Sequence, residues 1–340
     1  SDLDAFMKSI SLKPDYAEAY SNMGNVLKDQ GKLNEAIKAY KKSITFNPDY
    51  TAAYFNIGIA LKDMGNFNEA IKSFKKVILI KPSYAEAYNN LGIVLADKGK
   101  LDEAIQAYKK YISLKPDNAF AYYNFGNALQ KQGKLDCAIE AYKQALTINP
   151  KYTEAFCNMG VALQNQGNFD EAIVVYKKSI SIKPNYEDAH HNIGLILLDQ
   201  GKLDQAITVF KKVISINANN ADAYNNMAIA FKNQCKFDES IESCERALKV
   251  KPDYAEAYNN LGVALKNQGK LEQAIDAFMK SISLKPDYAE AYSNMGITFK
   301  DQGKLDEAII ASKKSTSLKP DHAEAYSNMG NILQNQGKLD

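Results

Sequence analysis

The sequence predicts an all-α protein, a solenoid built from stacked pairs of helices. The 340 residues consist of ten lengths of a 34-residue repeat that needs no insertion or deletion. The 9 prolines all occupy one position of this repeat, and the 18 glycines occupy only two positions. No glycine or proline is therefore left to build turns of another kind.

Each residue has a repeat position from 1 to 34, counted from the start of its unit. The units begin at Ala17, Thr51, Ala85, Ala119, Thr153, Glu187, Ala221, Ala255, Ala289 and Ala323. The prolines lie at position 32, and the glycines lie at positions 8 and 15.

The first half of each unit predicts a helix over about positions 2–14. Apolar or small residues recur at positions 4, 7, 8 and 11, the spacing of one helix face. Glycine at position 15, as in Gly31, accepts a positive φ and ends the helix. An Asp followed three residues later by Glu, as in Asp15 and Glu18, predicts a capping box at the helix start.

The second half predicts a second helix with its apolar residues at positions 17, 20, 21, 24 and 28. The Asp or Asn at position 18, as in Asp102, is the expected N-cap. Proline at position 32, as in Pro48, lacks an N–H and stops the helix. We therefore expect about twenty helices in a single solenoid over residues 1–340. It comprises a half repeat at 1–16, nine full repeats at 17–322 and a half repeat at 323–340.

The composition is that of a folded protein without an obvious charged partner. Hydrophobic residues make up 46%, and 42 Lys and Arg oppose 40 Asp and Glu, for a net charge of +2. This excludes a disordered tail and gives no reason to expect nucleic acid or a membrane surface as partner. The apolar runs are too short to span a membrane. We expect a cytoplasmic protein. Natural solenoids close with a polar capping helix, and because neither end of this chain has one, we expect a fragment of a longer solenoid.

The sequence predicts a protein that is not an enzyme. Its three His and four Cys match no metal-ligand or redox spacing, and no unit holds a nucleophile–base pair or a phosphate-binding loop. We expect no cofactor, no metal, no catalytic residue and four reduced thiols.

The repeat resembles the tetratricopeptide repeat (TPR) family, whose signature the first unit carries in Tyr20, Gly24, Ala36, Tyr40 and Pro48. The phrase Pro-Asp-Tyr-Ala-Glu-Ala-Tyr is most similar to the repeats of O-linked N-acetylglucosamine transferase and of many bacterial TPR proteins. The resemblance implies a right-handed superhelix of antiparallel helix pairs. It also implies that the first helices line a concave groove.

Position 6 is asparagine in every unit, and we call this row the asparagine ladder. Its members are Asn22, Asn56, Asn90, Asn124, Asn158, Asn192, Asn226, Asn260, Asn294 and Asn328. A carboxamide both donates and accepts hydrogen bonds, so a row of them can hold an extended peptide by its backbone. The resemblance to the transferase family points the same way. Two alternatives are that these amides bond the backbone of the next repeat, or that recent duplication copied them.

Three aromatic residues on the first helices are candidate peptide anchors. Phe55 and Tyr123 replace small polar residues at position 5, and Phe120 replaces the acid at position 2. His191 occupies the same position 5 in the sixth unit. The alternative is that these rings pack on a neighbouring helix.

The same helix faces are mildly acidic. Acidic residues at positions 2 and 13 outnumber the lysines at positions 12 and 13. This argues against a phosphate backbone as ligand and for neutral or basic peptide segments.

The seventh unit departs from the repeat. Ala218 replaces proline, Ala228 and Cys235 replace glycine, Ser240 replaces alanine and Cys244 replaces the aromatic residue at position 24. We expect it to be the weakest unit.

Two functions fit these observations. The first is a non-catalytic protein–protein interaction scaffold that binds extended peptides. The alternative is the substrate-recruiting region of a glycosyltransferase whose catalytic domain lies outside this chain. The two half repeats also complement each other, so we expect weak head-to-tail self-association through the uncapped ends.

Overall fold

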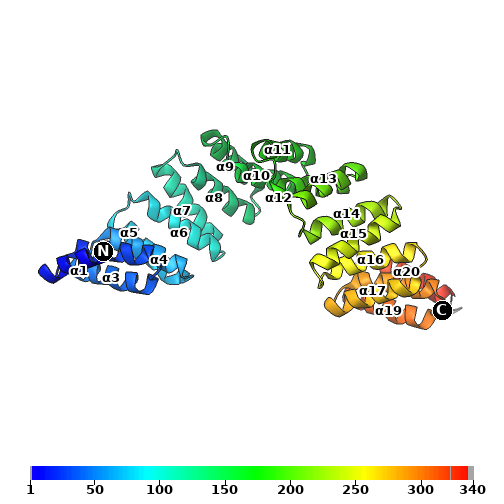
Figure 1. Cartoon of the computed structure of the whole chain (residues 1–340). Coiled ribbons are helices and arrows are strands. Elements are labelled where there is room, and N and C mark those ends of the chain that lie inside the picture. Colours follow the sequence, from blue (N-terminus) through cyan, green and yellow to red (C-terminus); the bar gives the residue numbers. More distant parts are fainter. Residues whose placement is uncertain (1, 322, 336–340) are drawn as a thin grey trace. The chain divides into compact units, whose positions relative to one another are not determined.

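The computed structural model describes residues 2–321 and 323–335, apart from the side chains of residues 323–325, 332, 333 and 335. In this part of the chain the secondary structure consists of twenty α-helices without a strand (Figure 1). The prediction of an all-α fold made of helix pairs is confirmed. None of the described helices combines the length and the apolar character needed to cross a membrane.

The helices form two compact units, Ser1–Ile182 and Lys183–Asp340, each of which holds several of the 34-residue repeats. The helices of the first unit are α1 Asp2–Leu12, α2 Ala17–Asp29, α3 Leu33–Phe46, α4 Thr51–Asp63, α5 Phe67–Ile80, α6 Ala85–Asp97, α7 Leu101–Leu114, α8 Ala119–Lys131, α9 Leu135–Ile148, α10 Thr153–Asn165 and α11 Phe169–Ile182. Those of the second unit are α12 Glu187–Asp199, α13 Leu203–Ile216, α14 Ala221–Asn233, α15 Phe237–Val250, α16 Ala255–Asn267, α17 Leu271–Leu284, α18 Ala289–Asp301, α19 Leu305–Leu318 and α20 Ala323–Asn335. A single solenoid over 1–340 stays a prediction.

Within each of the two compact units, every helix packs against the helices before and after it in sequence. The first helices of consecutive repeats, such as α2 and α4, also touch directly. The first helices therefore form one layer of each unit and the second helices the other (Figure 1).

The predicted helix ends agree with the structure at position 15. Gly31 has φ +75°, and its N–H and that of Lys32 bond back to Lys28 and Leu27 at 2.8 and 2.9 Å. This is the backbone pattern of a glycine-terminated helix. Cys235 keeps the same turn with φ +59°, although it is not glycine.

The predicted caps were wrong at most helix starts. The N-cap of α2 is Tyr16, and that of α7 is Lys100, neither of which makes a side-chain cap bond. Asp102 instead accepts a hydrogen bond from Gln132 Nε2 of the next repeat at 2.6 Å. The same bond recurs at 2.5–2.8 Å in the pairs Gln166–Asp136, Gln234–Asp204 and Gln268–Asp238. The acid at position 18 therefore joins consecutive repeats.

The core of each pair rests on close contact between positions 8 and 24. A Cβ added to Gly24 would lie 2.5 Å from Cε1 of Tyr40, a ring that is fully buried. In the seventh unit both positions change together, since Ala228 replaces the glycine and Cys244 the ring. Both are fully buried, so a smaller side chain at one position accompanies a larger one at the other.

The first and last helices are poorly covered. No residue of α1 is buried, and Met7 and Leu12 are 48% and 75% exposed. Tyr326 of α20 is 46% exposed, and the side chain of Leu333 lies outside the described residues. Head-to-tail association through these ends stays a prediction.

Candidate peptide-binding surface

The asparagine ladder lies on the first helices, one member on each even-numbered helix from α2 to α20. All ten side chains are half-buried. Their amides are thus held against the protein while part of each side chain meets solvent. Burial of this kind fixes a polar group only when it has hydrogen-bond partners.

Several ladder amides donate from Nδ2 to a side chain of the preceding repeat. The acceptor lies at position 9 in Asn56–Asn25 at 2.9 Å and Asn158–Asn127 at 2.8 Å. It lies at position 5 in Asn260–Asn225 at 2.9 Å, Asn294–Asn259 at 3.0 Å and Asn328–Ser293 at 3.5 Å. Part of the ladder therefore joins consecutive repeats, through side chains of the preceding repeat and not through the backbone of the next.

The carbonyl side of these amides is used differently. In the described part of the chain, a ladder Oδ1 accepts a hydrogen bond only at Asn90, from Lys62 Nζ at 3.4 Å. Asn90 Nδ2 turns to the backbone carbonyl of Glu86 at 2.9 Å, and Asn124 Nδ2 is buried without a described partner. Apart from that of Asn90, the ladder Oδ1 atoms are therefore acceptors that the described residues leave unused.

Two of the three candidate anchors pack between other rings. Phe55 lies 5.8 Å from Phe74 and 5.1 Å from Tyr84, measured between ring centroids. Tyr123 occupies the equivalent place, and its hydroxyl accepts a hydrogen bond from Asn158 Nδ2 at 3.1 Å. For these two side chains the structure provides the packing role that the sequence left open.

The third candidate anchor is more accessible. Phe120, at the start of α8, is 50% exposed. The His191 ring lies edge-on to that of Phe210, with 5.8 Å between their centroids, and burial lowers the pKa of its imidazole. Phe120 is therefore the side chain of this group that offers most apolar surface to a ligand.

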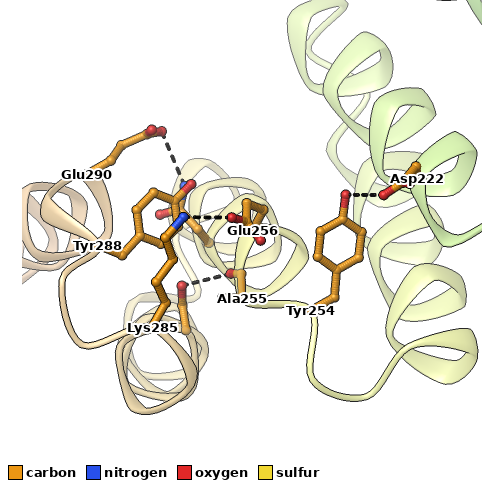
Figure 2. Close-up of polar contacts among 9 residues, drawn as sticks. Asp222, Tyr254, Ala255, Glu256, Lys285, Tyr288 and Glu290 are labelled. Carbon is orange, nitrogen blue, oxygen red and sulfur yellow. Dashed lines mark hydrogen bonds and ion pairs between the residues drawn. The ribbon is translucent and has the colours of Figure 1, made fainter. Parts of the chain in front are cut away.

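A cluster of charged and aromatic groups lies beside the starts of α14, α16 and α18. Figure 2 shows Tyr254 donating its hydroxyl proton to Asp222 at 2.6 Å and Lys285 paired with Glu256 at 2.9 Å. The hydrogen bond from Lys285 lowers the pKa of Glu256. Burial raises the pKa of the Tyr254 hydroxyl, and its bond to Asp222 raises it further. The acids at position 2 are thus partly occupied by the protein's own groups.

The lysines of this cluster form a repeated feature that the sequence analysis missed. Position 31 is lysine in seven repeats: Lys13, Lys81, Lys115, Lys183, Lys251, Lys285 and Lys319. Five of them lie 4.5–5.8 Å from the ring centroid of the tyrosine three residues later. Lys115 pairs with Glu86 as Lys285 does with Glu256. These lysines offset the negative charge counted on the first helices, and the recurring Lys-Pro-Asp-Tyr phrase was the available signal.

No described cluster of His, Cys, Asp and Glu could hold a metal ion. The four cysteines are reduced thiols, with Cys137 and Cys235 exposed and Cys157 and Cys244 buried. Burial raises the pKa of the Cys244 thiol to about 12, so this thiol remains protonated at neutral pH.

Sequence comparisons identify the repeat along almost the whole chain. Residues 82–284 match the C-terminal domain family of cilia and flagella-associated protein 70, a TPR region. TPR repeat families match residues 5–38, 24–65, 58–99 and 253–321. No curated protein matches the chain.

Solved structures share the fold. YrrB, described as a TPR protein with an unusual peptide-binding site, is 25% identical over 56% of this chain and 97% of its own, with a TM-score of 0.51. A TPR protein from Parabacteroides merdae is 21% identical over 73% of this chain and 98% of its own, with a TM-score of 0.58. The Cut9–Hcn1 structure is 13% identical over 97% of this chain and 81% of its own, with a TM-score of 0.57.

A particular closeness to O-linked N-acetylglucosamine transferase stays a prediction. The repeat period, the helix pairs and the matched families agree, and the chain belongs to the tetratricopeptide repeat family.

Proposed function

We propose that this chain is a non-catalytic protein–protein interaction scaffold that binds extended peptide segments along its first helices. The ladder supplies the main contacts, through Oδ1 atoms that accept the peptide's backbone N–H groups. Such contacts are independent of the peptide's side chains, so a ladder suits ligands of varied sequence.

The observation that supports this most is the fixed orientation of the ladder amides. Asn158 Nδ2 is held by Asn127 and Tyr123, which leaves Oδ1 as the only part of the amide available to a ligand. Acceptors that are held in place before binding lose little entropy when a ligand arrives. The same bonds also serve the protein's own stability, so the two roles coexist in one side chain.

The ligand preference follows from the charges. Glu and Asp at position 2 favour neutral to basic segments, and the lysines at position 31 weaken this preference where they pair. Phe120 serves as an apolar anchor beside Asn124. A substrate-recruiting role for a glycosyltransferase is the second candidate, because the repeat phrase resembles that of the transferase, and it predicts the same peptide contacts.

The experiment is a peptide array followed by titration of the strongest peptide against single variants. Asn158→Ala removes the Oδ1 acceptor, and Tyr142→Phe is its matched control. The Tyr142 hydroxyl donates to Asn127 Oδ1 at 2.8 Å behind the ladder, and its ring is fully buried. Both variants disturb the same bond network, but only Asn158→Ala removes a ligand contact.

We expect Asn158→Ala to weaken peptide binding about fivefold to tenfold, the effect of one hydrogen bond, and Tyr142→Phe to leave affinity unchanged. If both variants weaken binding equally, or neither does, the ladder has only a structural role.

A further inference from the structure

A separate pocket lies in the second compact part of the chain, Lys183–Asp340, where the α13–α14 loop meets α14 and α15. It has a volume of about 740 Å³, within the range of small-molecule sites. Its lining consists of Ala218, Asn219, Tyr224, Arg246, Lys249 and Val250. None of these residues belongs to the asparagine ladder or to the cluster around Glu256.

The charged residues that line the pocket are both cations. Arg246 and Lys249 lie three residues apart on α15, so they project from one side of the helix. Both are unusual for the chain. Arg246 is its only arginine, and Lys249 stands at a position that is Ser215 in the previous unit and Ser283 in the next.

The nearest acid binds Arg246 only weakly. Glu242 Oε1 lies 3.9 Å from an Arg246 guanidinium nitrogen, and the two side chains are 70% and 58% exposed. An exposed ion pair at this distance contributes little, so a ligand can displace it. A guanidinium binds phosphate oxygens through paired N–H donors, and an ammonium adds a point charge.

The rest of the lining suits the organic part of a ligand. The Tyr224 hydroxyl and the Asn219 amide offer neutral hydrogen bonds, while Val250 and the Tyr224 ring offer apolar surface. Ala218 replaces the proline that nine other repeats carry at this position. A proline ring there would take up part of the space.

We propose that this pocket binds the phosphate monoester of a small organic molecule. A phosphate monoester carries a charge of about −1.5 to −2 at neutral pH, which two cations balance. A carboxylate carries a single charge and would leave one of the cations unpaired. The bare phosphate ion is much smaller than the pocket and uses none of its apolar surface.

The test titrates the whole chain with phenyl phosphate, inorganic phosphate and benzoate by calorimetry. We expect phenyl phosphate to bind. Benzoate should bind at least about tenfold more weakly because it loses a charge-assisted contact, and inorganic phosphate at least about tenfold more weakly because it buries none of the apolar surface. Arg246→Gln and Lys249→Ser should each weaken phenyl phosphate binding about tenfold or more. Ala218→Pro, which restores the repeat's own residue, should also weaken it.

Lys280→Gln is the matched control. Lys280 has the repeat position of Arg246 in the next unit, where Ser283 takes the place of Lys249, and we expect no change in binding. Circular dichroism at the titration temperature checks that every variant is folded.

Three results would overturn the proposal: no heat and no shift of Arg246 or Lys249 side-chain NMR signals with phenyl phosphate, equal affinity for inorganic phosphate or benzoate, or unchanged affinity in both Arg246→Gln and Lys249→Ser. The ladder is not involved, so none of these outcomes bears on peptide binding.

Discussion

The Tyr142 ring occupies the space into which a side chain at Gly126 would project. A Cβ on Gly126 would lie 2.6 Å from Cε1 of Tyr142, whose ring is fully buried. Real side-chain carbons do not approach each other this closely, so either the helices separate or the ring moves. The contact explains why position 8 is glycine wherever position 24 is aromatic.

Gly126→Ala should therefore destabilise the protein. Overpacking lowers the free energy of unfolding by about 1–3 kcal/mol, and the better helix propensity of alanine offsets about 1 kcal/mol of this loss. We expect a lower unfolding temperature, measured by circular dichroism. In the Tyr142→Cys background, which reproduces the Ala228 and Cys244 pair of the seventh unit, the same Gly126→Ala change should raise stability. An equal loss in both backgrounds would contradict the steric explanation.

Cys235→Gly should stabilise the seventh unit. Cys235 has φ +59°, a conformation that costs a residue with a Cβ about 1–2 kcal/mol. The greater freedom of glycine in the unfolded chain cancels part of this gain, so we expect about 0.5–1 kcal/mol in urea unfolding. Cys137→Gly is the control with the opposite sign, because Cys137 lies inside α9 and glycine weakens a helix by about 1 kcal/mol. A loss of stability in Cys235→Gly would show that the turn is not strained.

The helices were predictable because their signals are local. Gly31 and Pro48 mark helix ends through their own backbone geometry, and the apolar spacing fixes the buried face. The N-cap predictions were wrong because the contact that decides them is not local. Asp102 has the local pattern of an N-cap, but a glutamine 30 residues away is a better partner for it.

The candidate surface was less predictable than the fold. The row of asparagines is visible in the sequence, but the partners of Asn158 lie 31 and 35 residues away on another helix. The pairing of Lys285 with Glu256 spans 29 residues and depends on how a loop crosses the start of the helix. Such contacts follow from the stacking of repeats, which a pattern within one repeat does not specify.

The Lys285–Glu256 pair predicts a pH-dependent contribution to stability. The bond from Lys285 lowers the pKa of Glu256 in the folded protein, so the stabilisation is present above the unfolded pKa and lost as the pH falls through the folded one. With side chains 43% and 42% exposed, the pair is worth about 0.2–1 kcal/mol. Lys285→Gln should therefore be less stable than the wild type near pH 7, and the difference should shrink as the pH falls below about 4 and vanish only below the lowered pKa of Glu256 in the folded protein.

Urea unfolding at several pH values measures this difference. Lys280→Gln removes a charge from the last turns of α17, the helix that ends just before Lys285, without removing an ion pair of the described residues. It should show no such pH dependence. A constant difference between Lys285→Gln and the wild type would mean that packing of the lysine on Tyr288, and not its charge, is responsible.

The ladder asparagines should differ in their importance for stability. Asn158→Ala removes the donor that Asn127 Oδ1 and the Tyr123 hydroxyl share, although Asn127 Oδ1 keeps its bond from the Tyr142 hydroxyl. The loss of a hydrogen bond costs about 0.5–1.5 kcal/mol. Asn22 donates no hydrogen bond to the described residues, so Asn22→Ala should change stability by less than about 0.5 kcal/mol. Replacing Asn124, Asn158 and Asn192 together should therefore lower the unfolding temperature, mainly through Asn158. Hydrogen exchange locates the effect, and we expect faster exchange in α8 and α10 for Asn158→Ala. Equal exchange in Asn158→Ala and Asn22→Ala would show that the bonds of Asn158 do not join the repeats.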